Sequence, residues 1–477
     1  MAAEAVCVLK TAVWPSFPRD SHFRFLLSLN RNSFQKNLVM KRYFCCFLMA
    51  MGFLTNCRKP GTVIGNELGP SAYPSDVVDK WLTLEIRLFR NAKGISNGAF
   101  ARPFAYSGIS AFESTDPGRE SWKNKYNGLS SLPARDKRVV YHWPSSVNAS
   151  LAEFNRSFFT TGNSSAADLA AIDSLENAIK ATFSFLPWEV TEHSNGFGRA
   201  VADAIFAWSQ TDRYNENNAL PYTPPIGPAL WEPTPPAFAV AVGPFWGNDR
   251  TIIAGSGDNA QPPAPLAFSE DTHSAFYKMV NDLYVASKSL TTDQKDWALF
   301  WRDVPGVTTP GHWMSIVQQV LRQTESRLDK ATMSFALVGI CLADANISVM
   351  KTKYKYNLVR PVTYIRRNMG DSAWLPFIAT PAHPEYSSAH CVVSASAAEA
   401  LTALFGSIGS FTDHTGADQG FPARTFQTFR GIAIDAGNSR FYGGIHYQPT
   451  IDAGITQGRI VGGNILGSLG LISGREK

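Results

Sequence analysis

The feature that most constrains the fold is a helical spacing of apolar residues that recurs along the chain beyond the first 75 residues. In "SDVVDKWLTLEIRLFR", apolar side chains fall three or four residues apart at Trp81, Leu84 and Leu88, after an N-cap at Ser75 or Asp76. Alternating apolar and polar runs, which would indicate strands, are scarce. The chain is therefore predicted to be all-α, a multi-helix bundle.

Ten further segments show the same helical spacing. They are residues 98–113, 166–183, 198–209, 272–287, 292–301, 313–327, 331–351, 388–405, 422–439 and 451–467. With 477 residues, 44% of them hydrophobic, the chain can bury a large core. We expect an N-terminal helical half over 76–290 and a C-terminal half over 291–477, packed as one unit. The Pro-rich stretch 222–238 is predicted to be an extended surface connection.

The N-terminus resembles an export signal. From Met40 the sequence reads "MKRYFCCFLMAMGFLTNC", in which two basic residues precede an apolar run that ends at Cys57. We interpret 40–57 as a signal peptide with a lipobox-like end, Cys57 as the lipidated residue, and 58–75 as a flexible tether. Residues 1–39 are then a disordered or non-native extension. The protein is expected to be exported, periplasmic or on the outer surface, with a lipid anchor.

Charge, the length of apolar runs and cysteine content argue against several classes of protein. Residues 1–56 carry seven Lys or Arg and two Asp or Glu, so the net charge of +5 resides there and the rest of the chain is neutral. A nucleic-acid surface has no support. No apolar run of about 20 residues follows the N-terminus, which argues against a polytopic membrane protein. Only Cys341 and Cys391 remain in the body, and they form neither a disulfide framework nor a CxxC metal pattern.

All strong chemical candidates fall between residues 350 and 456, in three short segments. Lys353 is followed after six residues by Arg360-Pro361, and Ser388-Ala389-His390 opens a predicted helix. Ser439-Arg440 is followed after five residues by His446. Each residue alone fits an ordinary solvated charge, cap or turn, and the serine pair Ser387-Ser388 could simply cap its helix.

Together, the three segments have the chemistry of a site for a tetrahedral oxyanion. Arginine guanidinium groups bind its oxygens in pairs, and the free N–H groups and dipole of a helix start favour its charge. One histidine can bond to the central atom while another transfers a proton. We therefore expect the helix capped by the serine pair to face an anion. The side chains should converge on a pocket about the size of a phosphate group.

These segments resemble the signature of the superfamily of vanadium-dependent haloperoxidases and type-2 phosphatidic acid phosphatases. Its motifs are Lys-x6-Arg-Pro, Pro-Ser-Gly-His and Ser-Arg-x5-His-x3-Asp. The resemblance extends to "WLPFIATPAHPEY" and "GGIHY", and more faintly to "GHWMSIVQQVL" and "ARPFAYSGISAFES". It implies an all-α fold with an oxyanion cradle within the helical bundle.

The resemblance also implies a role for each residue of the three segments. Lys353, Arg360 and Arg440 would hold the oxygens of the anion, and Ser388 and the N–H of Ala389 would add hydrogen bonds. His446 would be the axial ligand of vanadium in a haloperoxidase, or the nucleophile in a phosphatase. His390 would be the general acid and base. His383 stands where haloperoxidases place a His or Phe beside the peroxide and halide. These implied site residues are Lys353, Arg360, His383, Ser388, Ala389, His390, Arg440 and His446.

The sequence departs from the family pattern at four positions. Ala389 replaces Gly, which would make a positive φ costly, and Ser387 replaces Pro. Thr450 stands where the motif has Asp, so Asp452 could support His446 or, instead, cap the last helix. Met350 stands where halide-oxidising relatives often carry Trp.

The resemblance leaves three functions open. The first is a vanadium-dependent haloperoxidase that uses vanadate, halide and hydrogen peroxide. The second is a soluble acid phosphatase, which would need no cofactor and would cleave phosphomonoesters through a phosphohistidine. The third is a non-catalytic exported helical lipoprotein. The length of chain before the motifs favours the first, since the lipid phosphatases of the superfamily are shorter and span membranes.

Overall fold

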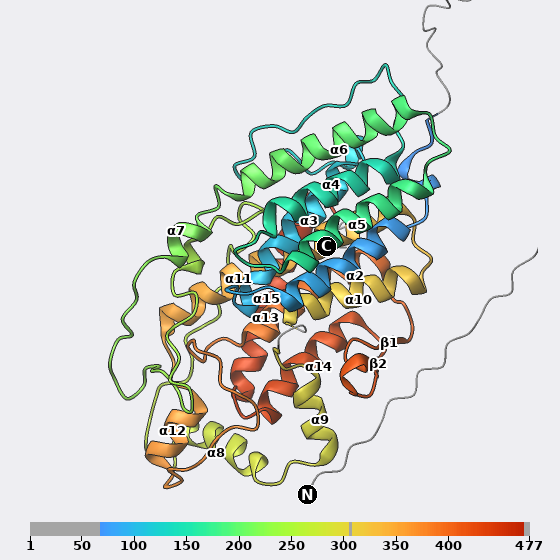
Figure 1. Cartoon of the computed structure of the whole chain (residues 1–477). Helices are drawn as coiled ribbons and strands as arrows, with labels where there is room; N and C mark the ends of the chain where they lie inside the picture. Colours follow the sequence, from blue (N-terminus) through green and yellow to red (C-terminus); the bar gives the residue numbers. More distant parts are fainter. Residues whose placement is uncertain (1–66, 305–307, 472–477) are drawn as a thin grey trace, which may run out of the picture. The chain divides into compact units, whose positions relative to one another are not determined.

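Helices make up most of the protein in the computed structural model, which describes residues 67–304 and 308–471 (Figure 1). These residues contain fourteen α-helices, five short 3₁₀ helices and a single two-stranded antiparallel sheet. The prediction of an all-α fold is confirmed. Residues 1–57, where the signal peptide and Cys57 are predicted, lie outside the described residues.

The elements follow one another along the chain with few long gaps. The α-helices are α2 (Asp76–Asn91), α3 (Ala101–Glu113), α4 (Trp143–Phe158), α5 (Ala166–Thr182), α6 (Trp188–Ser209), α7 (Tyr214–Asn218), α8 (Ala275–Ser287), α9 (Thr292–Phe300), α10 (Thr309–Gln323), α11 (Leu328–Tyr356), α12 (Pro361–Asn368), α13 (Ala389–Phe405), α14 (Phe429–Tyr442) and α15 (Gln448–Leu469). The strands are β1 (Phe411–Asp413) and β2 (Arg424–Phe426), and the 3₁₀ helices are η1 (Pro70–Ala72), η2 (Asn97–Phe100), η3 (Gly118–Glu120), η4 (Trp246–Asn248) and η5 (Ala417–Gln419).

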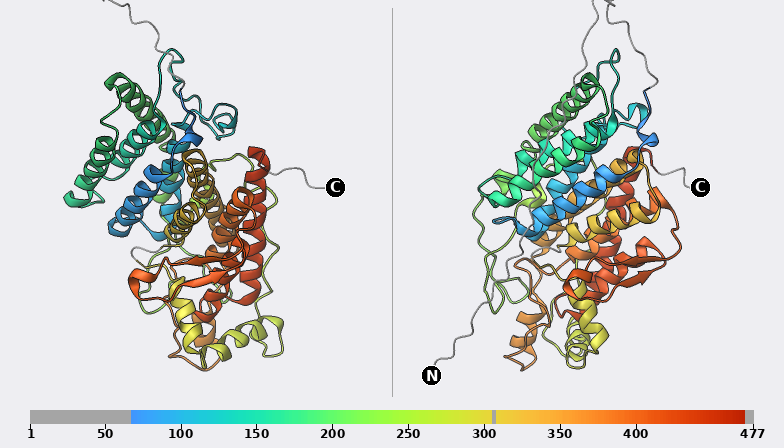
Figure 2. Two further views of the ribbon diagram at one scale, coloured as in Figure 1. Left: turned by 90° about the vertical axis from the view of Figure 1, so that its right-hand side faces the viewer. Right: turned by 45° about the vertical axis from the view of Figure 1, so that its right-hand side comes forward.

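The long helix α11 forms the centre of the described residues. It packs against α3 on one side and against α13 and α15 on another, so helices from 76–290 and from 291–477 share one compact unit (Figure 2). From the sequence, no apolar run long enough for a membrane span was expected beyond the N-terminus. Within the described residues, α11 does have the length and composition of one, but 78% of that stretch is buried inside the fold, as expected of a core helix.

Glycines allow the helices around the site to approach one another closely. On α15, Gly454, Gly458 and Gly462 recur every fourth residue and face α13. A Cβ atom added at Gly458 would lie 2.2 Å from the carbonyl oxygen of Val392, closer than real Cβ contacts. Because any larger residue would push α13 away, this contact fixes the first turn of α13, which opens at Ala389.

Several helix boundaries differ from the prediction. The α4 helix was missed because polar residues such as Ser145, Ser146 and Asn148 are buried among the apolar ones in "WPSSVNASLAEF" and interrupt the apolar spacing. The α6 helix begins ten residues before the predicted start at Gly198. The predicted helix over 422–439 was wrong at its start, since residues 424–426 pair with β1 and the helix runs over 429–442.

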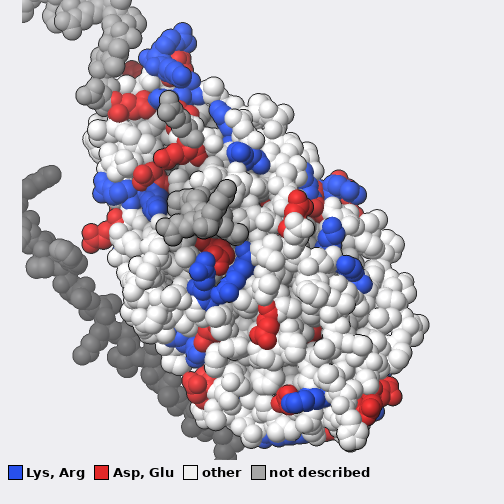
Figure 3. Space-filling view, turned by 180° about the vertical axis from the view of Figure 1, so that it is seen from behind, with Lys and Arg blue, Asp and Glu red and all other residues white. Residues whose placement is uncertain are grey.

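Charged residues are interspersed on the surface. On the face drawn in Figure 3, Lys and Arg lie among Asp and Glu over most of the described residues. The Pro-rich stretch 222–238 is a loop in the structure and includes no α-helix. Trp231 of this loop donates its N–H to the carbonyl of Asn357, so the loop is tied to the end of α11.

Candidate functional site

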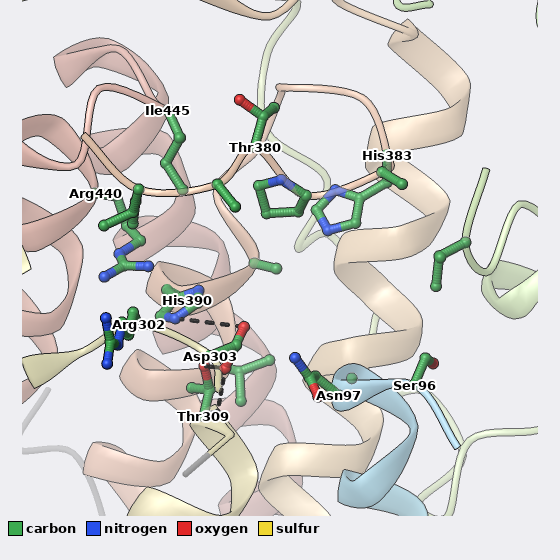
Figure 4. A pocket seen from close by; sticks show the side chains of 18 of the residues that line it. Ser96, Asn97, Arg302, Asp303, Thr309, Thr380, His383, His390, Arg440 and Ile445 are labelled. Carbon is green, nitrogen blue, oxygen red and sulfur yellow. Dashed lines mark hydrogen bonds and ion pairs between the residues drawn. The ribbon is translucent and has the colours of Figure 1, made fainter. Parts of the chain in front are cut away.

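A cavity of about 610 Å³ lies where the three predicted segments meet (Figure 4). Its walls come from the 377–383 segment, the first turn of α13, Arg440 of α14, the 445–446 turn, the segment after α9, and α11. Cavities of this size suit a small-molecule ligand. The cavity is larger than the phosphate-sized pocket that we expected, because apolar residues such as Trp246 and Phe377 extend it well beyond the predicted residues.

The structure brings all eight predicted residues into one region. Five of them line the cavity: His383, Ala389, His390, Arg440 and His446. The other three do not line it: Arg360 contacts His383 and His446, Ser388 precedes Ala389 in the chain, and Lys353 contacts the backbone of Pro384, the residue after His383.

Lys353 lies near the end of α11 and is fully buried. Its Nζ donates to the carbonyl oxygens of Pro384 at 2.8 Å and Glu385 at 3.1 Å. Burial, and then the neighbouring Arg360 guanidinium, lowers the pKa of Lys353 well below its usual value. A bound anion would reverse that shift, since it favours the charged ammonium.

Arg360 connects the segments that hold two of the histidines. Its Nε donates to the carbonyl of His383 at 2.9 Å, and its Nη1 donates to the carbonyl of Ile445 at 2.9 Å. Nη1 also lies 3.3 Å from Nε2 of His446, and Nη2 lies 3.0 Å from Nδ1 of His383. Burial lowers the pKa of Arg360 to about 10. His383 is thus held by Arg360 at the edge of the cavity.

Arg440, on α14, is the third buried cation of the predicted site. Its Nε donates to Ser439 Oγ at 3.0 Å and its Nη2 to the carbonyl of Ala298 at 3.1 Å. Burial lowers the pKa of Arg440 to about 10. Among the described residues, no carboxylate oxygen lies within 4.0 Å of Lys353, Arg360 or Arg440. Three buried cations without a paired carboxylate are costly for a protein, and an anion bound among them would offset that cost.

The first turn of α13 has free polar groups. The prediction that the serine pair caps this helix was wrong: Ser388 holds the N-cap position, but its side chain caps no N–H group. Ser387 instead donates to Oε1 of Gln457 at 2.6 Å. Ser388 Oγ is buried and makes no hydrogen bond with the described residues. A buried hydroxyl and an uncapped helix start beside three cations suit an anion.

Ala389 fits its position without backbone strain. The concern that a non-glycine residue would need a positive φ was wrong, since Ala389 begins α13 and is absent from the positive-φ residues of the described chain. Its backbone N–H therefore remains where the motif glycine would place it. Its methyl group contributes to the cavity wall.

His390 is buried beside a carboxylate that the sequence analysis missed. Its Nε2 lies 2.9 Å from the carbonyl oxygen of Trp301 and 3.7 Å from Oδ2 of Asp303. Asp303 Oδ1 is fixed by the N–H and hydroxyl of Thr309, at 2.8 and 3.1 Å (Figure 4). Burial, with a further contribution from Arg440, lowers the pKa of His390 to about 4. The imidazole is therefore neutral near pH 7 and can accept a proton.

His446 has a carboxylate partner that was also missed. Its Nδ1 lies 2.9 Å from Oε1 of Glu385, which belongs to the stretch "WLPFIATPAHPEY". Burial raises the pKa of Glu385 to about 7, although Arg360 and Lys353 lower it. Burial and the same cations hold the pKa of His446 well below its usual value. The imidazole is thus neutral, with Nε2 directed at the Arg360 guanidinium.

The expected roles of Asp452 are not found. Its carboxylate accepts from Gln448 Nε2 at 3.0 Å, so it supports neither His446 nor the helix start, where Tyr447 holds the N-cap position of α15. An acidic residue within an apolar, Pro-flanked stretch is unusual, and this signal could have identified Glu385. Asp303 gave no such signal, because it joins His390 only through the fold.

Comparisons with known proteins show similarity to one family model and to several solved structures. The family model described as the VCPO second helical-bundle domain matches residues 333–470. The crystal structure of a bacterial vanadium-dependent iodoperoxidase is similar, with 29% identity and a TM-score of 0.76, over 83% of this chain and 96% of that one. No curated protein matches the chain.

Two further solved structures show the same fold at lower identity. They are the apo and holo forms of a bacterial vanadium-dependent chloroperoxidase, each 16% identical to this chain. Their TM-scores are 0.58 and 0.59, over 79% and 87% of this chain and 95% and 94% of theirs.

Proposed function

We propose that this chain, which belongs to the vanadium haloperoxidase superfamily, is a vanadium-dependent haloperoxidase that oxidises halide with hydrogen peroxide. The observation that carries the proposal is the set of three buried cations without a carboxylate partner, beside two neutral histidines and an uncapped helix start. The overall reaction consumes one halide, one peroxide and one proton and yields hypohalous acid and water.

The residues present fit vanadate. Lys353, Arg360 and Arg440 would hold its oxygens, and the orphaned hydroxyl of Ser388 and the N–H of Ala389 would add donors. The Nε2 lone pair of His446 would bond to the vanadium. Bound vanadate supplies a Lewis-acidic centre that activates peroxide toward attack by halide.

The other residues of the cavity control protons and water. Neutral His390 can take a proton from bound peroxide and return it to the product, and Asp303 and the Trp301 carbonyl hold its ring in place. His383 is fixed by Arg360 at the cavity wall, where we place the halide. Apolar side chains such as Trp246 and Ile445 limit the entry of water.

Vanadate reconstitution tests the proposal. The purified chain is loaded with orthovanadate and assayed for peroxide-dependent halogenation of a phenolic dye with chloride, bromide and iodide. We expect turnover that requires vanadate, peroxide and halide together. A phosphomonoester assay runs in parallel, because the same cations could bind a phosphoryl group. Phosphatase activity that vanadate inhibits, without any halogenation, would overturn the proposal in favour of an acid phosphatase. Absence of both activities in a folded protein would also overturn it.

We further propose that the protein is exported and anchored by a lipid at Cys57. The support is the sequence alone: Lys41 and Arg42 precede an apolar run that ends at this cysteine. Cells that express the full chain should incorporate radiolabelled fatty acid into it, and Cys57→Ser should lose the label while Cys341→Ser keeps it. A label that persists in Cys57→Ser, or no label in the native chain, would contradict the anchor.

A further inference from the structure

We propose that Glu385 is the residue that positions His446, in place of the aspartate that the family motif has at position 450. The inference rests on the proposed function in one respect only, the role of His446 as the ligand of vanadate. In this chain the carboxylate has moved from the first turn of α15 to the segment before α13, and Thr450 has become its hydrogen-bond donor.

The contacts of Glu385 define its role. The side chain is fully buried and receives three hydrogen bonds. Oε1 accepts from Nδ1 of His446 at 2.9 Å and from the N–H of Tyr447 at 3.2 Å, and Oε2 accepts from the hydroxyl of Thr450 at 2.9 Å. Oε1 accepts the N–H of Tyr447 with one lone pair. Its second lone pair can accept the N–H of the imidazole.

The contacts at the two ring nitrogens of His446 require the same tautomer. A carboxylate oxygen faces Nδ1, and the guanidinium of Arg360, which has no acceptor, faces Nε2 at 3.3 Å. A neutral imidazole satisfies both partners only with its proton on Nδ1 and its lone pair on Nε2. Glu385 therefore presents the unprotonated Nε2 toward the cations, which is the form that can bond to vanadium or phosphorus.

The backbone of Glu385 is anchored as firmly as its side chain. Its N–H donates to the carbonyl of Leu358 at 3.0 Å, and its own carbonyl accepts from Nζ of Lys353 at 3.1 Å. One residue thus orients the histidine through its side chain and a cation of the cradle through its backbone. Thr450 Oγ1 lies 2.9 Å from Oε2 of Glu385, so an aspartate at position 450 would bring a second carboxylate against the first, and the two charges would repel. Glu385 and Thr450 are a matched pair.

Relocation of the carboxylate tests this inference directly. We would compare Glu385→Ala with the double variant Glu385→Ala/Thr450→Asp, which returns the acid to the motif position. In vanadate-free protein with ¹⁵N-labelled histidine, the ring nitrogens of His446 are assigned by their loss in His446→Asn. We expect a single Nδ1–H tautomer in the native chain, a mixture in Glu385→Ala, and recovery of the single tautomer in the double variant.

Affinity for orthovanadate, measured by isothermal titration, is the second readout. Loss of such a supporting carboxylate weakens ligand affinity by about 10- to 100-fold, and we expect Glu385→Ala to fall in this range and the double variant to recover most of it. Glu385→Gln keeps an oxygen for Nδ1 and should lose less. If Glu385→Ala does not fold, Glu385→Gln and Glu385→Gln/Thr450→Asp replace it, with the same expected order.

A matched control separates positioning from stability. Glu113 is also buried and also receives three hydrogen bonds, from Ser121, Trp122 and Tyr126. Glu113→Gln should lower the melting temperature without any change in the His446 tautomer or the vanadate affinity. An unaltered tautomer in a folded Glu385 variant would overturn the inference, as would a double variant no better than the single one. The tautomer is read without halide or vanadium, so failure of the haloperoxidase proposal would leave this result intact.

Discussion

The partly buried cations of the N-terminal helices have carboxylate partners, whereas the fully buried cations around the cavity have none among the described residues. In the N-terminal half, Arg102 binds Asp212 with Nε 2.5 Å from Oδ2, and Glu176 is surrounded by Arg156, Lys180 and Arg199. These pairs hold helices together, and each of the four cations has a carboxylate partner. Around the cavity, Lys353, Arg360 and Arg440 are at least as deeply buried and have no paired carboxylate within the described residues.

The presence or absence of a carboxylate partner distinguishes a cation that stabilises the fold from a cation that can bind a ligand. A buried ion pair satisfies itself and adds little net stability, whereas a buried unpaired cation destabilises the free protein and stores binding energy for an anion. Sequence alone does not separate the two, because Arg102 and Arg440 have the same chemistry. The structure separates them by whether a carboxylate faces the guanidinium.

The largest expected effect concerns His446, the residue that we assign as the ligand of vanadate. His446→Ala should abolish tight vanadate retention and turnover, because it removes the Nε2 lone pair that would bond to the central atom and leaves only the cations to hold the anion. Equilibrium dialysis against vanadate, followed by vanadium analysis, measures retention. The exposed His193 on α6 is the matched control, and His193→Ala should retain the metal fully. Retention by a folded His446→Ala protein would contradict the assigned ligand.

His390 should separate binding from chemistry. His390→Ala should lower turnover by about 10²–10⁴, the usual contribution of a positioned acid or base. Vanadate affinity should stay within about tenfold, roughly 1.4 kcal/mol, because the cations and His446 remain. Titration calorimetry and initial rates on the same sample give both numbers. Loss of binding as complete as in His446→Ala would show that His390 is part of the cradle itself.

The two kinds of buried arginine should respond differently to the same substitution. Arg102→Met leaves Asp212 buried without its cation and should cost about 3 kcal/mol of unfolding free energy, with vanadate affinity unchanged. Arg440→Met removes an unpaired cation, so stability should change by less than about 1 kcal/mol. Its vanadate affinity should fall about 10- to 100-fold, in line with a charged hydrogen bond of about 1.5–3 kcal/mol. Urea unfolding and calorimetry of both variants test the comparison, and equal losses of stability would refute it.

The buried histidines around the cavity should make the free energy of unfolding depend on pH. Burial lowers the pKa of His390 to about 4 in the folded protein, below its usual value of 6.5, so the unfolded chain takes up a proton first as the pH falls. Stability from this group is complete above pH 6.5 and is lost down to about pH 4. His383 and His446 shift in the same direction, whereas Glu385, with its pKa raised to about 7, opposes them between pH 7 and 4.5.

Comparison with a variant isolates the contribution of His390. Between pH 7 and 5, the native protein should lose roughly 2 kcal/mol more than His390→Ala, and saturating phosphate should reduce the difference. Asp413, whose pKa burial raises but His312 lowers to a net value below the usual one, contributes only at lower pH. Urea unfolding at several pH values gives these numbers. A native protein and variant with parallel pH profiles would show that His390 is not held neutral by burial.

The sequence could predict the all-α fold, and its three motif segments predict one site. Arg440 and His446 line the same cavity, and Arg360 contacts His446 behind its wall, whereas the binding of one ligand by these residues stays a prediction. Asp303 could not be found, because its approach to His390 depends on the packing of the segment after α9. The α4 helix escaped detection for a similar reason: serine and asparagine side chains interrupt its apolar spacing, and their burial depends on the packing of neighbouring helices.

The smallest effect is expected at Ala389, the position where the sequence departs from the family motif closest to the anion. Ala389 has helical backbone angles as the first residue of α13, so Gly is not needed there for conformation. Ala389→Gly should cost less than about 1 kcal/mol of stability through the flexibility of glycine. Ala403→Gly, at an exposed site near the other end of α13, should cost a similar amount. Because the N–H donor is the same in both residues, vanadate affinity and turnover of Ala389→Gly should stay within about threefold of the native values, roughly 0.7 kcal/mol. A tenfold rise in turnover would instead show that the methyl group obstructs the cavity, and that this chain carries a partly blocked version of the cradle.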